Sequence, residues 1–152
     1  MQLAALNGGR VKISNRAIKE LSKGLHGSLL LPDDPDYDQA RTIWNALIDR
    51  RPGIIVRCVD RADIAAAINF ARRHDTLISV RGGGHNHTGF AVCDGGLMLD
   101  LSRMRAVQVD PDAKTARVEG GTTFADYDAA THQAGLASTG AIVSMVGVAG
   151  YT

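Results

Sequence analysis

The stretch Arg81-Gly82-Gly83-Gly84-His85-Asn86-His87-Thr88-Gly89 decides the fold of this chain. It directly follows residues 77–81, a short apolar segment typical of a buried strand. Three consecutive glycines each cost roughly 0.5–1 kcal/mol of backbone entropy relative to alanine, so they indicate positive φ angles or a close backbone approach. Successive N–H groups in such a loop form a concavity that binds phosphate oxygens. The carboxyl end of a strand is also where α/β sheets bind ligands.

Other interpretations of this loop remain open from the residues alone. Glycine is common in turns, so the triplet also fits a tight turn that closes the sheet. His85 and His87 are a possible metal-ligand pair, with Asp94 or Asp100 as a third donor, although no other His/Cys pair supports that site. The two common nucleotide motifs, G-x-G-x-x-G with its flanking elements and G-x-x-x-x-G-K-[ST], are absent. His85 is the better functional candidate because it directly follows the glycines.

Glycine is unevenly distributed along the rest of the chain. Five of the 17 glycines lie in the first 81 residues and twelve in the last 71. Gly120-Gly121 follows a predicted hairpin, and Gly140 with residues 146–150 forms a small, apolar, glycine-rich stretch. We expect these groups to converge with the first loop against a flat ligand. A buried strand of small residues explains residues 146–150 equally well.

The segments before the loop have the pattern of an α/β unit. Ser14 is a candidate N-cap, and Asp60 opens the clearest helix of the sequence. The strand-helix-strand order between residues 54 and 81 predicts two parallel strands. The pattern predicts helices over 15–24, around 40–47 and over 60–74, and strands over 28–31, 54–59 and 77–81.

The segments after the loop are richer in strands. The pattern predicts a strand over 97–101, an antiparallel hairpin of 105–109 with 115–119, and a helix capped by Thr122 or Thr123 that ends near Gly135. Residues 137–152 show no helical periodicity. We therefore predict an α+β fold with two parts. Residues 1–81 form an N-terminal α/β subdomain, and residues 82–152 form the glycine-rich loop and the beginning of a second subdomain.

The composition excludes several classes of protein. Seventeen basic and 16 acidic residues give a net charge of +1, which offers no electrostatic reason to expect nucleic acid or an anionic membrane as partner. Cys58 and Cys93 make neither a disulfide framework nor a metal-binding spacing, and the first residues lack a basic leader. Cys93 is a small buried side chain or a nucleophile with His85 or His87 as base. We expect a soluble, cytoplasmic protein.

Jointly the motifs resemble one family over nearly the whole chain. The chain resembles the FAD-binding domain of the vanillyl-alcohol-oxidase and p-cresol-methylhydroxylase (PCMH) type, specifically the berberine-bridge-enzyme-like (BBE-like) FAD-linked oxidases. The residues that carry the resemblance are Arg81 to Asn86, Gly89, Cys93-Asp-Gly-Gly96, Leu99 to Met104, Tyr37-Asp38, Arg41, Trp44-Asn45, Pro52, Val118 to Gly121 and Gly140 to Gly150.

The resemblance implies a bound FAD and a set of residues that hold it. Residues 81–86 match the loop around the FAD pyrophosphate, and His85 matches the histidine that bonds covalently to the 8α carbon of the flavin. Some members attach the flavin through a cysteine as well, but Val143 stands at that place, so a single histidyl bond is implied. The implied cofactor-binding residues are Arg81, Gly82, Gly83, Gly84, His85, Asn86, Gly89, Gly140, Val146, Gly147 and Gly150.

The resemblance also implies an activity. Members oxidise an alcohol or amine carbon of a small molecule, passing hydride to the flavin N5 and electrons to O2 or another acceptor. The rest of their FAD domain, their substrate domain and the catalytic base follow the part that matches this chain. We therefore expect an N-terminal part of a longer oxidase, inactive alone, and assign no catalytic residue. The alternatives are an FAD-binding module without its own catalysis and a metal-dependent hydrolase that uses His85 and His87.

Overall fold

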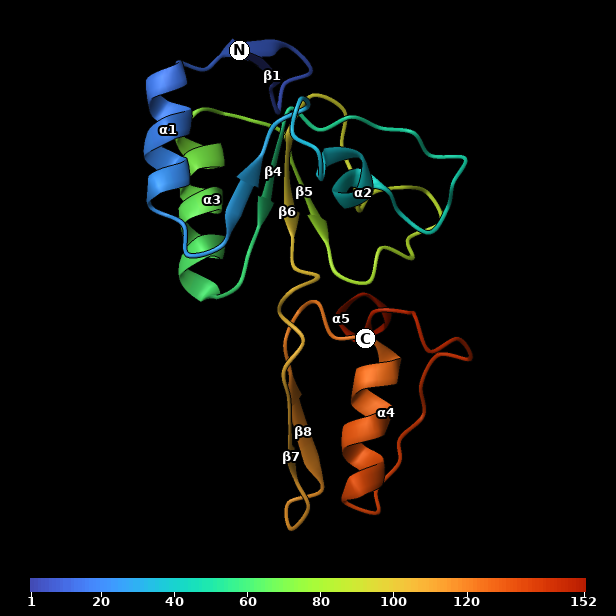
Figure 1. Cartoon of the computed structure of the whole chain (residues 1–152). Helices are drawn as coiled ribbons and strands as arrows, with labels where there is room; N and C mark the ends of the chain where they lie inside the picture. Colours follow the sequence, from blue (N-terminus) through green and yellow to red (C-terminus); the bar gives the residue numbers. More distant parts are fainter.

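A four-stranded sheet forms the centre of the larger part of the molecule in the computed structural model, which describes residues 1–152 (Figure 1). The strand order is β3-β4-β6-β5. β4 and β5 each pair in parallel with β6, so the predicted parallel orientation is confirmed, while β3 is antiparallel to β4. We call residues 82–89 the glycine loop. β6 follows this loop in sequence and lies between β4 and β5 in the sheet. The strands are β3 (Ser28–Leu30), β4 (Ile54–Arg57), β5 (Ile78–Arg81) and β6 (Leu97–Asp100).

Helices cover both faces of this sheet. α1 (Asn15–Lys23) and α3 (Arg61–Arg73) lie side by side on one face, and α2 (Tyr37–Arg41) lies on the other (Figure 1). Side chains of the central strands alternate between two cores, because successive residues of a strand point to opposite faces. In β6, for example, Leu97 and Leu99 pack toward α1 and α3, and Met98 packs in the cluster of α2.

Local sequence signals correctly predict where two of these helices begin. The Ser14 hydroxyl accepts a hydrogen bond from the Ala17 N–H at 3.1 Å, and Asp60 accepts one from the Asp63 N–H at 3.0 Å. The helix predicted around residues 40–47 is wrong, because α2 ends at Arg41 and Thr42 is already extended, with ψ at 132°. Polar contacts of an irregular segment replace the missing helical turns.

The N-terminal residues form a hairpin that the sequence pattern does not predict. β1 (Gln2–Ala4) pairs with β2 (Arg10–Lys12) in antiparallel register. Gly8 adopts a positive φ of 83° in the turn between them. The hairpin docks on the sheet through the Ala4 N–H, which donates to the Gly95 carbonyl at 2.9 Å.

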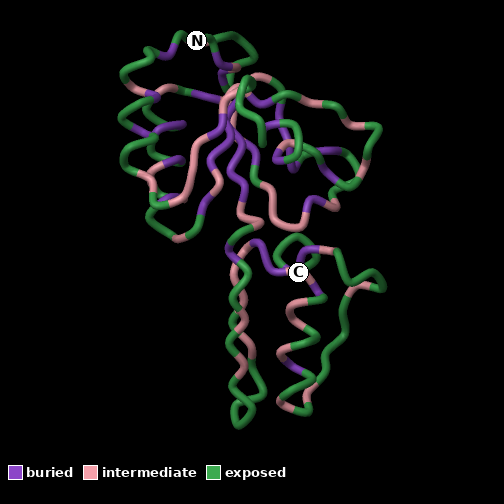
Figure 2. The backbone as a smooth tube through the Cα atoms, viewed as in Figure 1, coloured by how far each residue is buried: buried purple, intermediate pink, exposed green.

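The smaller part of the molecule consists of the second hairpin and two helices (Figure 1). β7 (Val107–Asp110) pairs with β8 (Thr115–Val118), as predicted, and α4 (Phe124–Gln133) follows with Thr123 as its N-cap. α5 (Val148–Tyr151) is a single helical turn in the stretch where no helix was predicted. Figure 2 shows that buried residues concentrate in the larger part, while the hairpin and α4 are mostly exposed or half-buried. The structure has no helix of the length and apolarity needed to span a membrane.

Asp63 is a buried polar anchor of the larger part. Its side chain is fully buried and accepts hydrogen bonds from the backbone N–H groups of His26 at 2.8 Å, Gly27 at 3.0 Å and Val59 at 2.9 Å. Asp63→Ala leaves these donors without a partner, and we expect it to lower the free energy of unfolding by about 3 kcal/mol. Urea unfolding measures this change, with the exposed Asp128→Ala as control. Equal stability of the two variants would contradict the assignment.

Candidate cofactor site

The loop after β5 faces the C-terminal segment (Figure 1). Residues of both line a cavity of about 950 Å³. Its volume is at the upper end of the roughly 300–1,000 Å³ of small-molecule and cofactor sites. Its lining consists mainly of residues 82–88, Gly120 and residues 140–151 without Ser144, Met145 and Val148. Val80, Phe90, Ala91 and Leu101 complete it. The cavity therefore lies between the larger and the smaller part of the molecule.

The three glycine groups converge at this cavity, as the sequence predicts. A Cβ atom on Gly83 would lie 2.3 Å from the Gly147 nitrogen, and one on Gly147 would lie 2.5 Å from the Gly83 nitrogen. A Cβ on Gly82 would lie 2.6 Å from the Gly120 carbonyl oxygen. Because the nearest atoms are backbone in each case, no side chain can move aside to make room. Glycine is therefore required for these segments to meet.

The glycine loop has an unusual set of free hydrogen-bond donors. None of the backbone N–H groups of residues 82–88 donates to another atom of the protein, and the next donors along the chain are Gly89 and Phe90. All seven of these residues line the cavity. Consecutive free N–H groups attract anionic oxygens, because each is a partial positive charge. The loop thus fits a phosphate group.

Nine of the eleven predicted cofactor-binding residues line the cavity. Arg81 and Gly89 do not. The Arg81 guanidinium donates to the Ala40 carbonyl at 2.8 Å, and Gly89, with a φ of +77°, packs against Ile48. These two residues contact parts of the chain outside the cavity and so help to fix the conformation of the loop. The nine lining residues are Gly82, Gly83, Gly84, His85, Asn86, Gly140, Val146, Gly147 and Gly150.

Apolar residues that the sequence did not single out complete the cavity wall. Phe90, Ile142 and Tyr151 line the cavity and are largely exposed, with 72%, 103% and 55% of their surface accessible. Exposed apolar side chains in irregular segments, such as Phe90 and Ile142, or in a single helical turn, such as Tyr151, have no distinctive sequence pattern. The one signal that could have identified these residues is that they lie next to the glycine groups in the sequence.

His85 has a restrained and largely neutral imidazole. Its ring stacks on the Trp44 indole, with ring centroids 5.1 Å apart and planes 21° from parallel. Burial lowers the pKa of His85 below the ordinary 6.5, and the charge of His87 lowers it further. A neutral imidazole keeps a lone pair on one ring nitrogen, which is what a nucleophile or a ligand needs.

The pKa shifts predict that two histidines titrate on opposite sides of 6.5. The Asp60 carboxylate raises the pKa of His26 by accepting its hydrogen bond, whereas burial lowers the pKa of His85. As the pH falls, His26 therefore protonates before His85. NMR titration of the imidazole protons measures both midpoints, and His26→Gln assigns the first. A His85 midpoint at or above 6.5 would contradict the environment described here.

The carboxylates considered as metal ligands have other partners. Asp94 accepts a hydrogen bond from the Arg51 N–H at 2.7 Å. Asp100 is buried, with the guanidinium groups of Arg57 and Arg81 each 3.7 Å away. Burial also raises the pKa of the Cys93 thiol, which favours the unreactive protonated form. The geometry thus supports neither a metal site at His85 and His87 nor a cysteine nucleophile.

Comparisons with known proteins show the family to which the chain belongs. The family described as FAD binding domain matches residues 52–152. The chain is 35% identical over 126 residues to (R)-6-hydroxynicotine oxidase of Paenarthrobacter nicotinovorans, covering 83% of this chain and 28% of that protein. It is also 35% identical over 128 residues to YgaK, an uncharacterised FAD-linked oxidoreductase of Bacillus subtilis, covering 84% and 28%.

Solved structures show the same fold. The crystal structure of 6-hydroxy-D-nicotine oxidase from Arthrobacter nicotinovorans matches with a TM-score of 0.80 and 32% identity, over 90% of this chain and 29% of that one. The Physcomitrella patens protein BBE-like 1 matches with a TM-score of 0.81 and 26% identity, over 88% and 29%.

The chain spans less than a third of the length of these relatives. Two of the expectations from sequence are nevertheless confirmed, the PCMH-type fold and FAD as the cofactor. We call residues 82–88, together with Gly120 and Gly147 that meet them, the glycine cradle. The cradle and its free N–H groups fit the pyrophosphate of that cofactor. From its fold, its site and its match over residues 52–152, the chain belongs to the family of FAD binding domains.

Proposed function

We propose that this chain holds the FAD of an oxidoreductase that oxidises an alcohol or amine carbon of a small molecule, with O2 as electron acceptor. The observation that carries the proposal is the row of seven free N–H groups on residues 82–88 at the cavity. When bound, FAD supplies the hydride-accepting chemistry, and the protein supplies binding and orientation.

The residues of this chain have distinct proposed roles toward FAD. Residues 82–86 bind the pyrophosphate through backbone N–H groups, and Arg81 and Gly89 hold the shape of that loop. Gly140, Val146, Gly147 and Gly150 line the opposite wall. The division of the chain into residues 1–81 and 82–152 stays a prediction.

His85 is the proposed point of covalent attachment. Its imidazole lines the cavity, and the lowered pKa keeps it neutral and nucleophilic near pH 7. His85 would hold FAD through a C–N bond to the 8α carbon, and its imidazole would give up the N–H proton. In the overall balance the 8α methyl would lose one hydrogen, and O2 would take up the two electrons and both protons as hydrogen peroxide. Val143, which lines the same cavity, has no nucleophile, so one bond is expected.

The activities of two relatives support a small-molecule substrate. One relative is a hydroxynicotine oxidase, and another, the grass pollen allergen Phl p 4, has glucose dehydrogenase activity. For this chain we propose a substrate of the same general kind, oxidised in the presence of the remaining FAD and substrate domains. The apolar wall of Phe90, Ile142 and Tyr151 offers surface against which those domains and a flat ring can pack.

A comparison of FAD with riboflavin tests the binding proposal. The fluorescence of either flavin changes when it binds to the protein, so one measurement serves for both ligands. Riboflavin differs from FAD in lacking the pyrophosphate. We expect the chain to bind one FAD at least about 100-fold more tightly than riboflavin, since hydrogen bonds to charged groups contribute roughly 1.5–3 kcal/mol each. Equal affinity for FAD and riboflavin would contradict the proposal that the loop N–H groups bind the pyrophosphate. A colourless protein with stoichiometric zinc that binds neither would favour the metal alternative.

A further inference from the structure

An irregular segment between α2 and β4 is hydrogen-bonded along the glycine loop. We call residues 42–52 the Trp44 loop. The Trp44 N–H donates to the Gly84 carbonyl at 3.1 Å, and the Asn45 side-chain amide donates to the His87 carbonyl at 2.8 Å. The Arg50 guanidinium donates to the Gly89 carbonyl at 2.6 Å. The Trp44 loop therefore fixes the glycine loop at its beginning, middle and end.

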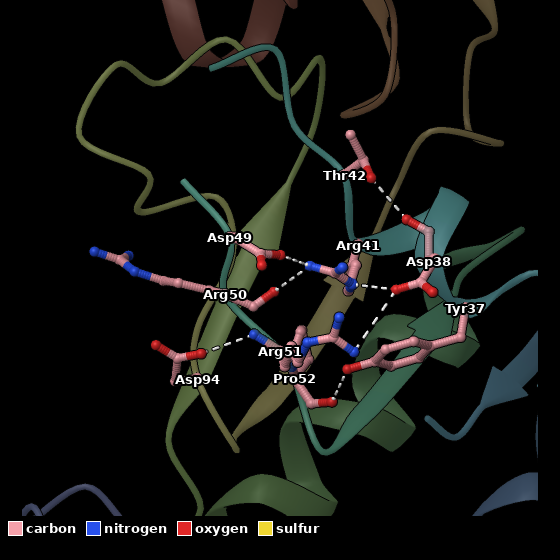
Figure 3. A network of polar contacts seen from close by, with 9 residues as sticks. All are labelled: Tyr37, Asp38, Arg41, Thr42, Asp49, Arg50, Arg51, Pro52 and Asp94. Atoms are coloured by element: carbon pink, nitrogen blue, oxygen red, sulfur yellow. Dashed lines mark hydrogen bonds and ion pairs between the residues drawn. The ribbon is translucent and has the colours of Figure 1, made fainter. Parts of the chain in front are cut away.

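The Trp44 loop is itself held by Arg41, the last residue of α2. The Arg41 guanidinium is largely buried, with 12% of the side chain accessible, and donates to Asp38 at 2.6 Å, to Asp49 and to the Arg50 carbonyl at 3.2 Å (Figure 3). These contacts raise the pKa of Arg41 and lower that of Asp49, so the ion pair is retained across the neutral range. One cation thus joins the two ends of the loop.

Two further contacts fix the end of the Trp44 loop to α2 and to the segment before β6. The buried Tyr37 hydroxyl donates to the Pro52 carbonyl at 2.6 Å, and the Arg51 N–H donates to Asp94 at 2.7 Å (Figure 3). Tyr37 packs with Ile55 and Met98 of the sheet, so the folded core fixes the end of the Trp44 loop at Pro52.

The Trp44 indole contacts both histidines of the glycine loop. It stacks on His85, and it meets His87 edge-on, with ring centroids 5.3 Å apart and planes at 89°. Half of the Trp44 side chain, 52%, is exposed, so burial in a core does not explain its position. The indole instead forms a flat wall beside the histidine that lines the cavity.

A flat wall supplies a restraint that the glycines do not. The glycine contacts fix the backbone at His85, but the terminal torsion of a histidine side chain is broad and roughly two-fold. Stacking limits that torsion, because the imidazole plane must stay close to the indole plane. The ring nitrogens are then limited to the two orientations that a ring flip exchanges.

We propose that Trp44 is a positioning residue that holds the imidazole plane of His85 for attachment of FAD. The inference rests on the proposed function, since it concerns the bond between His85 and the flavin. It predicts that removal of the indole slows formation of that bond while FAD still binds in the cradle.

The first test follows bond formation in aerated mixtures of the chain with FAD. The fraction of flavin that stays with the protein after acid denaturation is measured over time for the unmodified chain, Trp44→Leu, Trp44→Phe and the control Leu47→Ala, whose side chain is 93% exposed in the same loop. We expect attachment to slow roughly 2- to 10-fold in Trp44→Leu, the ratio that corresponds to an aromatic pair. Trp44→Phe should largely restore the rate, and the affinity for FAD should not change. Attachment at the unmodified rate in Trp44→Leu would overturn the inference.

The second test needs no flavin and separates this inference from the proposed function. Trp44 is the single tryptophan of the chain, so intrinsic fluorescence reports on it alone. A protonated imidazole stacked on an indole quenches its emission, and His87 is the other titratable group beside His85. We expect quenching with a midpoint below pH 6.5 that disappears in His85→Ala and persists in His87→Gln. Unchanged quenching in His85→Ala would overturn the stacking, whereas a missing flavin bond with intact stacking would count against the attachment alone.

Discussion

Gly83→Ala is expected to destabilise the chain by about 3 kcal/mol and to abolish measurable FAD binding. The added Cβ would lie 2.3 Å from the nitrogen and 2.6 Å from the Cα of Gly147, so two backbones must separate. Overpacking of this kind costs roughly 1–3 kcal/mol or more. Separation also widens the cradle between the glycine loop and the opposite wall. Urea unfolding and FAD titration measure the two effects.

A double-variant comparison makes this prediction specific to the contact. Gly147→Ala should be similarly destabilising, because its Cβ would lie 2.5 Å from the Gly83 nitrogen. Once the backbones have separated, the second alanine meets less resistance, so the two costs should not add. Gly24→Ala is the control, since its Cβ would make only ordinary contacts at 3.6 Å. Additive costs, or a Gly83→Ala variant that binds FAD normally, would contradict the close approach.

His85→Ala is expected to remove all covalently bound flavin while leaving FAD binding in place. The free N–H groups belong to the backbone of residues that line the cavity, so they remain when the imidazole is lost. Flavin should therefore co-purify with the folded His85→Ala variant and be released completely when that variant is denatured. His87→Ala is the matched control two residues away and should keep its attached flavin. Retention of flavin by denatured His85→Ala would place the attachment on another side chain.

The sequence predicts structure well where one local signal is sufficient. The caps at Ser14 and Asp60 make the predicted hydrogen bonds, because a capping side chain needs only its own first helical turn. The three glycine groups were predicted to converge and do, since clustered glycine already indicates a close backbone approach. The fold of the site was therefore accessible from composition and spacing.

Structure set by distant contacts was not predictable in this way. Ile43, Trp44 and Leu47 have helical spacing, but their side chains share no face. Ile43 is 4% exposed, Leu47 is 93% exposed and Trp44 lies against a histidine some 40 residues away. The N-terminal hairpin was missed because its three-residue strands are held by the sheet, through Ala4 and Gly95, and carry little pattern of their own. α5 was missed because one helical turn shows no periodicity.

The apolar cavity wall was the part of the site least visible in the sequence. Phe90 and Ile142 come from irregular segments and are exposed, so neither periodicity nor burial marks them. Their role depends on the convergence of the glycine groups, which brings them into the lining of the same cavity as His85.

Localisation of the flavin on the chain tests the central claim most directly. The chain is incubated with FAD in air, denatured, washed free of loose flavin and digested with trypsin, and the flavin-bearing peptide is fragmented in a mass spectrometer. The peptide that begins after Arg81 contains His85, His87 and Cys93, so fragmentation must distinguish these three side chains. The account predicts one flavin adduct, on His85. An adduct on His87 or Cys93, or a peptide without any adduct, would contradict it.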